Sequence, residues 1–293
     1  MEKKIFSVQI SEETLDKLKL FYSERITKSS ERYVRYEVKS PTLVIKIYDT
    51  LKVVFSGVDA YENALIWGYE DTVFKCLDNH MGSDEVGTGD YFGPVCVCAA
   101  YVKKEDIKWL EELGINDSKK LSDEKIKEIV PQIIKRVTYA SLTLDNIKYN
   151  QLVEKGFNQG MIKAYLHNKA FNALREKVND TKCLTVLDMF VNEKAYYNYL
   201  KNEKNIAENI HFETKAETYY PAVAVGSMIA RYSFITKMQR LSKELDMAIP
   251  MGSSTRVDRF AAEVIKRYGE DKLKEVAKIH FQNTKRAMLI AAE

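Results

Sequence analysis

The sequence has no cluster of cysteine or histidine residues. Its four cysteines, Cys76, Cys96, Cys98 and Cys183, form no C-x-x-C pair, and its four histidines are scattered along the chain. Structural zinc sites and disulfide frameworks both need such residues at short, regular spacings. A zinc-ribbon or disulfide-stapled fold is therefore excluded, and we expect reduced thiols in a cytoplasmic protein.

Proline, glycine and long apolar runs are also scarce. Five prolines and twelve glycines in 293 residues are too few for a disordered or low-complexity chain. The longest nearly uncharged apolar run, residues 92–102, is about half of the ~20 residues that span a bilayer. The chain begins Met-Glu-Lys-Lys-Ile-Phe, without an apolar h-region. We therefore expect neither a secretory signal nor a membrane partner.

Neither sign of charge dominates the sequence. The net charge is +3. Residues 1–80 hold 12 Lys and Arg against 13 Asp and Glu, so the rest of the chain holds 33 against 29. This balance is far from that of a histone-like cationic protein. It permits a nucleic-acid partner without implying one.

The first part of the chain shows the pattern of a small α+β unit. Ser11 is placed to cap a helix that has Leu15 and Leu18 on one face. Two β-branched runs within residues 42–58 predict a hairpin, and residues 33–38 predict a strand before it. Residues 59–68 then favour a helix. We expect a domain over residues 1–70 and a linker over residues 71–81.

The remainder alternates between strands and helices, which is typical of an α/β domain. Its expected strands are residues 95–102, 139–144 and 183–190. Its expected helices begin at Ser122 and run over residues 152–178, from Pro221 to 245, and through much of residues 258–293. Pro131 should kink or break the first of these helices. We expect this domain to cover residues 82–293.

An acidic pair opens the second domain. Asp84 and Glu85 precede Gly87 and Gly89, two glycines that let backbone approach a ligand closely. Adjacent strand side chains point to opposite faces, so both acids cannot be ordinary solvated residues on a central strand. The alternative is a surface turn. The glycine spacing does not match the dinucleotide fingerprint G-x-G-x-x-G.

Two further acids stand at positions that suit a functional site. Asp188 ends an apolar run, and open α/β sheets place functional side chains at strand ends. Such an Asp also commonly forms a turn. Glu217 precedes the helix that starts at Pro221, where it could instead interact with the helix dipole.

The helix that begins at Pro221 carries small residues on one face. Ala222, Gly226 and Ala230 recur at every fourth position and leave this face without bulk. Such a face allows close packing against a sheet or against a phosphate backbone.

Several motifs together resemble type 2 ribonuclease H over the chain from residue 82 onward. They are GSDEVGTGDYFGPV, Asn116-Asp117-Ser118-Lys119-Lys120-Leu121, LHNKA, VLDMF and KAE…PAVAVGSMIAR. The chain is most similar to the ribonuclease HIII subgroup, because it has Gly-Thr-Gly where the HII group has Gly-Arg-Gly. It also has Glu217 where the HII group has Asp, and an N-terminal domain that resembles the TATA-box-binding-protein-like domain of the HIII group.

This resemblance implies a ribonuclease H-like α/β catalytic domain that cuts the RNA strand of RNA–DNA hybrids. Asp84, Glu85, Asp188 and Glu217 would be the catalytic and metal-binding residues. Four converging acids repel one another, and hard divalent cations relieve that repulsion. Two ions, Mg²⁺ or alternatively Mn²⁺, would support in-line attack of water and leave 5′-phosphate and 3′-hydroxyl ends.

The resemblance also implies a set of substrate contacts. The 2′-hydroxyl distinguishes RNA from DNA, and the Gly87-Thr88-Gly89 backbone would read it. Further expected substrate-binding residues are Asp117, Ser118, Lys119, Asn158 and Ser227. Residues 117–120 have an alternative interpretation as a solvated loop before the Ser122 cap.

The N-terminal domain is expected to bind the substrate. Its cations are interleaved with tyrosines, a pattern that suits a duplex: Arg32, Arg35, Lys39, Lys46, Lys52, Tyr33, Tyr36 and Tyr48. The alternative is a set of solvated strand faces. The expected form of the protein is a monomer.

Three other functions compete with the leading one. The first is a ribonuclease HII-like enzyme that cuts at single ribonucleotides in duplex DNA. The second is a resolvase or integrase, which would not need a reader of the 2′-hydroxyl. The third is a non-catalytic hybrid-binding protein, which would tolerate loss of the acids.

Overall fold

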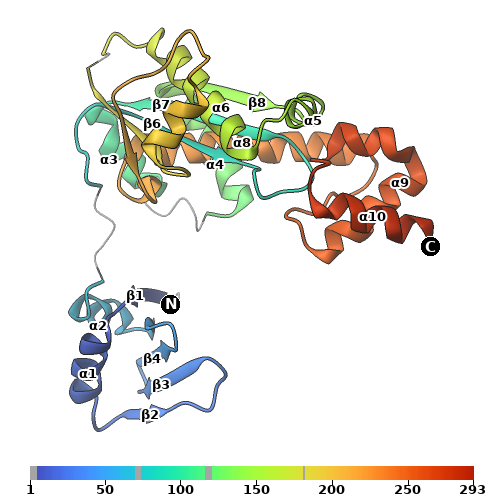
Figure 1. Cartoon of the computed structure of the whole chain (residues 1–293). Helices are drawn as coiled ribbons and strands as arrows, with labels where there is room; N and C mark the ends of the chain where they lie inside the picture. The colour runs from blue at the N-terminus through green and yellow to red at the C-terminus, as the bar shows by residue number, and fades with distance from the viewer. Residues whose placement is uncertain (1–4, 70–73, 116–120, 181) are drawn as a thin grey trace. The chain divides into compact units, whose positions relative to one another are not determined.

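A computed structural model describes residues 5–69, 74–115, 121–180 and 182–293. The chain divides into two compact units, Met1–Val73 and Phe74–Glu293 (Figure 1). None of the described helices is long and apolar enough to cross a membrane.

The smaller unit is an antiparallel sheet covered by two helices. The sheet has the order β1-β5-β4-β3-β2. The strands alternate between buried and partly exposed residues; in β4, Leu43, Ile45 and Ile47 face the helices. Its elements are β1 (Ile5–Gln9), α1 (Glu12–Phe21), β2 (Ile26–Lys28), β3 (Val34–Lys39), β4 (Leu43–Tyr48), β5 (Lys52–Gly57) and α2 (Ala60–Ile66). The expected α+β content is confirmed.

The larger unit contains a five-stranded mixed sheet with the order β10-β9-β6-β7-β8. β9 is parallel to β6 and β10, whereas β7 is antiparallel to β6 and β8. The strands are β6 (His80–Val86), β7 (Val95–Val102), β8 (Thr138–Leu144), β9 (Leu184–Asp188) and β10 (Ile210–Glu213). All eight residues of β7 are buried, as expected for the centre of a covered sheet.

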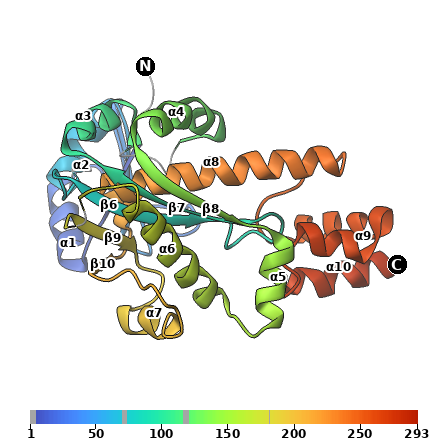
Figure 2. The ribbon, with the colours of Figure 1, turned by 90° about the horizontal axis from the view of Figure 1, so that it is seen from above.

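Helices cover both faces of this sheet (Figure 2). One layer includes α4 and α8, and the other includes α6 and α7. The helices are α3 (Lys104–Glu112), α4 (Asp123–Arg136), α5 (Asn146–Glu154), α6 (Gln159–Arg175), α7 (Glu193–Tyr199), α8 (Pro221–Glu244), α9 (Thr255–Val276) and α10 (Gln282–Ala292). A short 3₁₀ turn, η2 (Ala216–Thr218), precedes α8. The expected α/β class is confirmed.

The structure differs from the expected helices at two places. The expected helix over residues 152–178 is wrong, because α5 and α6 are separate helices. Gly156 has φ +89° between them, a conformation that ends a helix, and Asn158 then caps α6. Pro131 lies inside α4 without breaking it, since the apolar face of α4 packs into the core beside α8.

The region between the two units contains structure that belongs to the larger one. Phe74 is buried in the core beside α8, and β6 already begins at His80. Part of the segment expected as a linker over residues 71–81 is therefore packed against, or paired with, the larger unit.

Candidate active site

The acidic residues lie where β9 and its pairing with β6 end. Ser83 of β6 is paired with Leu187 of β9 in parallel register, so Asp84 and Asp188 follow at neighbouring positions of the same sheet edge. Glu217 enters from η2, the turn that connects β10 to α8, and it is buried. Together with Glu85, which follows Asp84 on β6, these acids come from three segments far apart in the sequence.

Asp84 and Glu85 point to opposite sides of the sheet, as strand alternation predicts. Asp84 faces α8, where the Ser227 hydroxyl hydrogen-bonds to it. Burial, followed by the charge of Glu85, raises the pKa of Asp84 to about 7. The Ser227 hydroxyl and the Glu85 backbone amide, 2.7 Å from Asp84 Oδ1, only partly oppose this rise.

Glu85 faces α6 and has two basic neighbours there. Lys163 Nζ donates to Glu85 Oε1 at 2.7 Å, and His167 Nε2 donates to Oε2 at 2.9 Å. Burial alone would raise the pKa of Glu85, but His167 and Lys163 outweigh burial and lower it to about 2. On the far side of the imidazole, His167 Nδ1 lies 2.7 Å from the Ser83 hydroxyl. The imidazole is thus fixed at both nitrogens.

Asp188 interacts with both Glu217 and Glu85. Its Oδ1 accepts a hydrogen bond from the Ala216 amide at 2.8 Å. Burial raises the pKa of Asp188, and Glu217 and Glu85 add to this rise although the Ala216 amide opposes it. The negative charges of the cluster therefore destabilise one another.

This electrostatic arrangement suits a divalent cation. Carboxylate oxygens are the ligands that Mg²⁺ and Mn²⁺ prefer, and a cation removes the mutual repulsion of such acids. Within the described residues, no three acidic, histidine or cysteine side chains already stand in a metal-binding arrangement. The donor chemistry fits a metal site.

The loop after β6 holds the Gly87-Thr88-Gly89 motif. Gly87 has φ +95°, and a methyl group there would lie 2.3 Å from the Pro94 carbonyl oxygen. The fold therefore requires glycine at this position. The Thr88 carbonyl accepts a hydrogen bond from Gln159 Nε2 at 2.6 Å. Gly89 is exposed, and a methyl group there would meet no atom within 4 Å.

The other expected substrate-binding residues have different surroundings. Ser227 lies beside Asp84, inside the acidic cluster. The Asn158 side chain accepts from the Met161 amide at 2.9 Å and caps α6, so its contact in the structure is local. Asp117, Ser118 and Lys119 lie outside the described residues.

The small face of α8 packs closely against the strand that carries the acidic pair. A methyl group on Gly226 would lie 2.7 Å from the Cys98 carbonyl oxygen, and one on Gly82 would lie 2.3 Å from the Val223 nitrogen. Of the two interpretations of this face, packing against the sheet is confirmed. This close approach brings Ser227 to Asp84.

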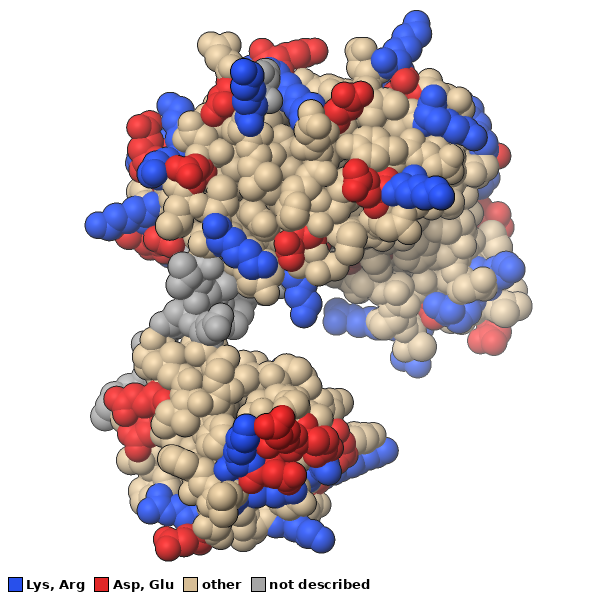
Figure 3. All heavy atoms as spheres, turned by 60° about the vertical axis from the view of Figure 1, so that its left-hand side comes forward, with Lys and Arg blue, Asp and Glu red and all other residues tan. Residues whose placement is uncertain are grey.

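Several basic residues of the smaller unit pair with neighbouring acids. Arg35 pairs with Glu12, Lys39 with Glu37, and Lys46 with Glu31. Tyr36 packs against the helix layer, away from the open face of the sheet. On the face shown in Figure 3, basic and acidic side chains are interspersed over both units. Much of the expected cationic surface is thus neutralised by neighbouring acids.

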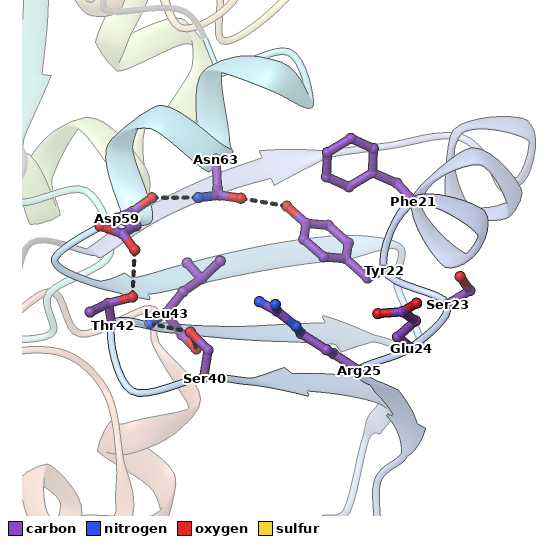
Figure 4. A pocket seen from close by; sticks show the side chains of 10 residues that line it. All are labelled: Phe21, Tyr22, Ser23, Glu24, Arg25, Ser40, Thr42, Leu43, Asp59 and Asn63. Carbon is purple, nitrogen blue, oxygen red and sulfur yellow. Dashed lines mark hydrogen bonds between the residues drawn. The ribbon is translucent and has the colours of Figure 1, made fainter.

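The smaller unit also contains a pocket of about 460 Å³ between its helices and the β3–β4 turn (Figure 4). Its polar groups mainly hydrogen-bond one another. The Tyr22 hydroxyl donates to Asn63 at 2.6 Å, Asn63 donates to the Asp59 carbonyl at 2.8 Å, and Thr42 donates to the Asp59 carboxylate. Arg25 extends into the pocket (Figure 4). Because the lining groups largely satisfy one another, the acidic cluster is the better candidate for chemistry.

Sequence reasoning assigned no role to Lys163, His167 or Gln159. Lys163 and His167 are four residues apart, the spacing that places two side chains on one helix face. That signal was present in the sequence, but their shared partner Glu85 becomes visible only once α6 is packed on the sheet. Gln159 had no comparable signal.

Known proteins resemble the chain over nearly its whole length. The family model described as ribonuclease HII matches residues 81–284, and a domain of unknown function (DUF3378) matches residues 6–77. Ribonuclease HIII of Bacillus mycoides (strain KBAB4) is 40% identical, with 96% of each chain covered. That of Bacillus cereus (strain ATCC 10987 / NRS 248) has the same identity and coverage.

Solved structures give the same result. Bst-RNase HIII in complex with Mn²⁺ is 35% identical, with a TM-score of 0.73 over 98% of this chain and 99% of that one. Ribonuclease H2 from Pyrococcus horikoshii OT3 is 20% identical, with a TM-score of 0.62 over 73% of this chain and 99% of that one, a likeness of fold alone.

Proposed function

Because the chain belongs to the ribonuclease HIII family, we propose that Asp84, Glu85, Asp188 and Glu217 form its catalytic, metal-binding centre. The protein is a ribonuclease H, an endonuclease that hydrolyses the RNA strand of RNA–DNA hybrids. The observation that carries the assignment of the centre is the convergence of the acids from β6, β9 and η2, where Glu217 is buried. Burial and neighbouring carboxylates raise the pKa of both Asp84 and Asp188, which lie at neighbouring positions of β6 and β9.

The metal of this centre is Mg²⁺ or Mn²⁺. A similar ribonuclease HIII has been solved in complex with Mn²⁺. The four carboxylates are hard oxygen donors that suit either ion. When bound, two ions would supply Lewis acidity for an in-line attack of water on the phosphodiester, which leaves 5′-phosphate and 3′-hydroxyl ends.

The chain's own residues hold this centre in place. His167 and Lys163 bind both oxygens of Glu85, and Ser83 fixes the imidazole from behind. The Ala216 amide orients Asp188. The Ser83 hydroxyl contacts His167, but Ser83 is fully buried and cannot reach a substrate, which agrees with direct attack by water.

Substrate recognition would come from the backbone and from polar side chains. The Gly87-Thr88-Gly89 backbone lies on the loop directly after the acidic pair, where it could read a 2′-hydroxyl. Ser227 would contact a phosphate next to Asp84. Asp117, Ser118 and Lys119 are proposed as further phosphate contacts from the family resemblance, and Asn158 as a weaker one.

We assign substrate binding to the N-terminal domain, residues 1–70, joined through residues 71–81 to the catalytic domain, residues 82–293. The smaller unit has its own hydrophobic core and its own sheet. We further propose a monomer in the cytoplasm. Light scattering coupled to gel filtration would test the monomer, and a mass near 33.8 kDa is expected.

A cleavage assay tests the proposed function. End-labelled RNA–DNA hybrid, duplex DNA and duplex RNA are each incubated with the protein, with and without Mg²⁺. We expect cleavage of the RNA strand of the hybrid only, and only with metal. Cleavage of duplex DNA would favour a resolvase, and metal-independent binding without cleavage would favour a hybrid-binding protein.

A further inference from the structure

The two glycines of the Gly87-Thr88-Gly89 motif have different structural explanations. Gly87 is required by the fold, because it has a positive φ and a side chain there would clash with Pro94 and Phe234. Neither a positive φ nor a steric clash explains the glycine at position 89. Its surroundings are open, it is exposed, and its φ lies outside the left-handed region. Glycine at this position is therefore best explained by the close approach of a ligand.

The peptide between Thr88 and Gly89 is fixed from one side. Gln159, the first residue of α6, donates from Nε2 to the Thr88 carbonyl oxygen at 2.6 Å. The peptide is trans, so its N–H points away from its C=O. Holding the Thr88 carbonyl toward α6 therefore directs the Gly89 amide away from α6. Among the described residues this amide donates no hydrogen bond.

The rest of the loop is held in the same way, by side chains that bind its carbonyl oxygens. The Asn146 side chain donates to the Gly93 carbonyl at 2.9 Å. The buried Lys278 ammonium donates to the carbonyls of Asp90 and Gly93. The carbonyls of Thr88, Asp90 and Gly93 are occupied from within the protein, whereas the Gly89 amide is a donor that the loop presents to a ligand. The complementary ligand group is an acceptor oxygen.

We propose that Gln159 is a positioning residue that aims the Gly89 amide at the 2′-hydroxyl oxygen of one ribonucleotide. This inference rests on the proposed function. It adds to that function the residue that orients the Gly89 amide. It also adds the direction of the hydrogen bond, in which the amide donates and the 2′-hydroxyl oxygen accepts. Gln159 is not needed as a helix cap, because Asn158 already caps α6.

A cycle that combines protein variants with substrate variants tests this proposal. Gln159→Met keeps the side-chain length but removes the donor, and Gln159→Glu replaces the donor by an acceptor. Gln151→Leu, an exposed position on α5, is the matched control. The substrates are one duplex with four consecutive ribonucleotides and four copies of it, each with a single 2′-hydroxyl replaced by hydrogen. Values of kcat/KM are measured for every pair.

On the intact substrate, we expect Gln159→Met and Gln159→Glu to lower kcat/KM about tenfold, the size of one lost hydrogen bond. On one of the four deoxy substrates, the two variants should have the same kcat/KM as the wild type. That substrate already lacks the 2′-hydroxyl that the Gly89 amide would bind. Gln151→Leu should behave as wild type on every substrate.

Three results would overturn the proposal. They are an equal loss on all five substrates, no loss on any of them, or failure of both Gln159 variants to fold; the first and last would show a structural role only. A wild-type protein that leaves every hybrid intact would instead contradict the proposed function itself, so the two failures are distinguishable.

Discussion

At the residue scale, Asp84 and Glu85 are neighbours in the chain but have opposite electrostatic surroundings. Asp84 lies among other acids, and its pKa is raised to about 7, whereas Glu85 lies beside Lys163 and His167, and its pKa is lowered to about 2. The alternation of a β-strand produces this difference, because it sends one acid to α8 and the other to α6. Glu85 therefore carries its charge more readily than Asp84 does.

Asp188 offers the clearest test of the catalytic assignment. Asp188→Asn removes one negative charge from the cluster and keeps the size of the side chain. We expect turnover to fall by at least a thousandfold, because the cluster supplies chemistry more than affinity. Cleavage rates in Mg²⁺ and hybrid affinity by fluorescence anisotropy provide the measurement.

Binding should change less than threefold in Asp188→Asn. Asp180→Asn, which lies before β9 and outside the acidic cluster, is the control and should cleave normally. A near-normal rate for Asp188→Asn would remove Asp188 from the catalytic set.

The acids of the candidate site could be found from the sequence, whereas their partners could not. Asp188 ends an apolar run, and Asp84 and Glu85 precede two glycines, so local patterns together with the family resemblance singled them out. In the chain, Lys163 lies 78 residues from Glu85, and Gln159 lies 71 residues from Thr88. Their contacts depend on how α6 crosses the sheet, which no local pattern encodes.

At the element scale, α8 is held against β6 by its small face and by a buried histidine. His80 Nε2 accepts a hydrogen bond from the Ala222 amide at 3.0 Å, near the N-terminus of α8, where helix amides lack internal partners. The opposite nitrogen, Nδ1, donates to the Asp78 carbonyl at 2.8 Å. His80 can make both bonds only in its neutral form.

The stability of the protein should therefore depend on the protonation of His80. Burial lowers the pKa of His80 below its usual 6.5, although the Asp78 carbonyl opposes this. Below pH ~6.5 the unfolded chain binds a proton that the folded chain resists. The contribution of His80 is thus fully present above that pH and is lost as the pH falls toward the folded pKa, with a slope of at most ~1.4 kcal/mol per pH unit.

Urea unfolding at pH 7.5 and pH 5.5 tests this dependence. The free energy of unfolding should fall more for the wild type than for His80→Gln. His211→Gln removes a more exposed histidine of β10 and serves as the control, with the wild-type pH dependence expected. If the free energy of unfolding falls equally in the wild type and in His80→Gln, the pKa of His80 is the same in the folded and the unfolded chain, and the prediction is wrong.

Most element boundaries followed from patterns that act within a few residues. Ser11 and Ser122 cap α1 and α4 as expected, and the eight-residue apolar run of β7 was found in full. The division of residues 152–178 was missed because the expected helix ran through Gly156, whose positive φ follows the end of α5. The persistence of α4 through Pro131 depends on packing in the core, which a local rule about proline does not include.

At the scale of the whole molecule, the two units have separate hydrophobic cores, so the smaller one can contribute affinity without taking part in chemistry. Removal of residues 1–70 should raise KM at least tenfold and change kcat less than threefold, as loss of uniform binding does. Steady-state kinetics on a continuous hybrid provide the measurement. Unchanged KM and hybrid affinity in the truncated protein would argue against a binding role for this unit.

The last prediction concerns how many ribonucleotides the protein needs. In the HII group, an arginine between the two glycines belongs to a site that recognises a single ribonucleotide within DNA. Thr88 stands at this position here, and its side chain offers one hydroxyl in place of a guanidinium with five donors. With fewer contacts at one junction, recognition must depend on several consecutive 2′-hydroxyls and on the A-like shape of the hybrid.

We therefore expect matched duplexes with four and twelve ribonucleotides to be cleaved at least tenfold faster than a duplex with one. All three are compared at one Mg²⁺ concentration, and Thr88→Arg is measured beside the wild type. If the arginine supplies the missing donors, Thr88→Arg should cleave the duplex with one ribonucleotide faster than the wild type does. The difference in cleavage rate between this duplex and the two others should then be smaller. Equal rates on all three duplexes would show that recognition in this chain does not depend on a run of ribonucleotides, while cleavage of the RNA strand would still identify a ribonuclease H.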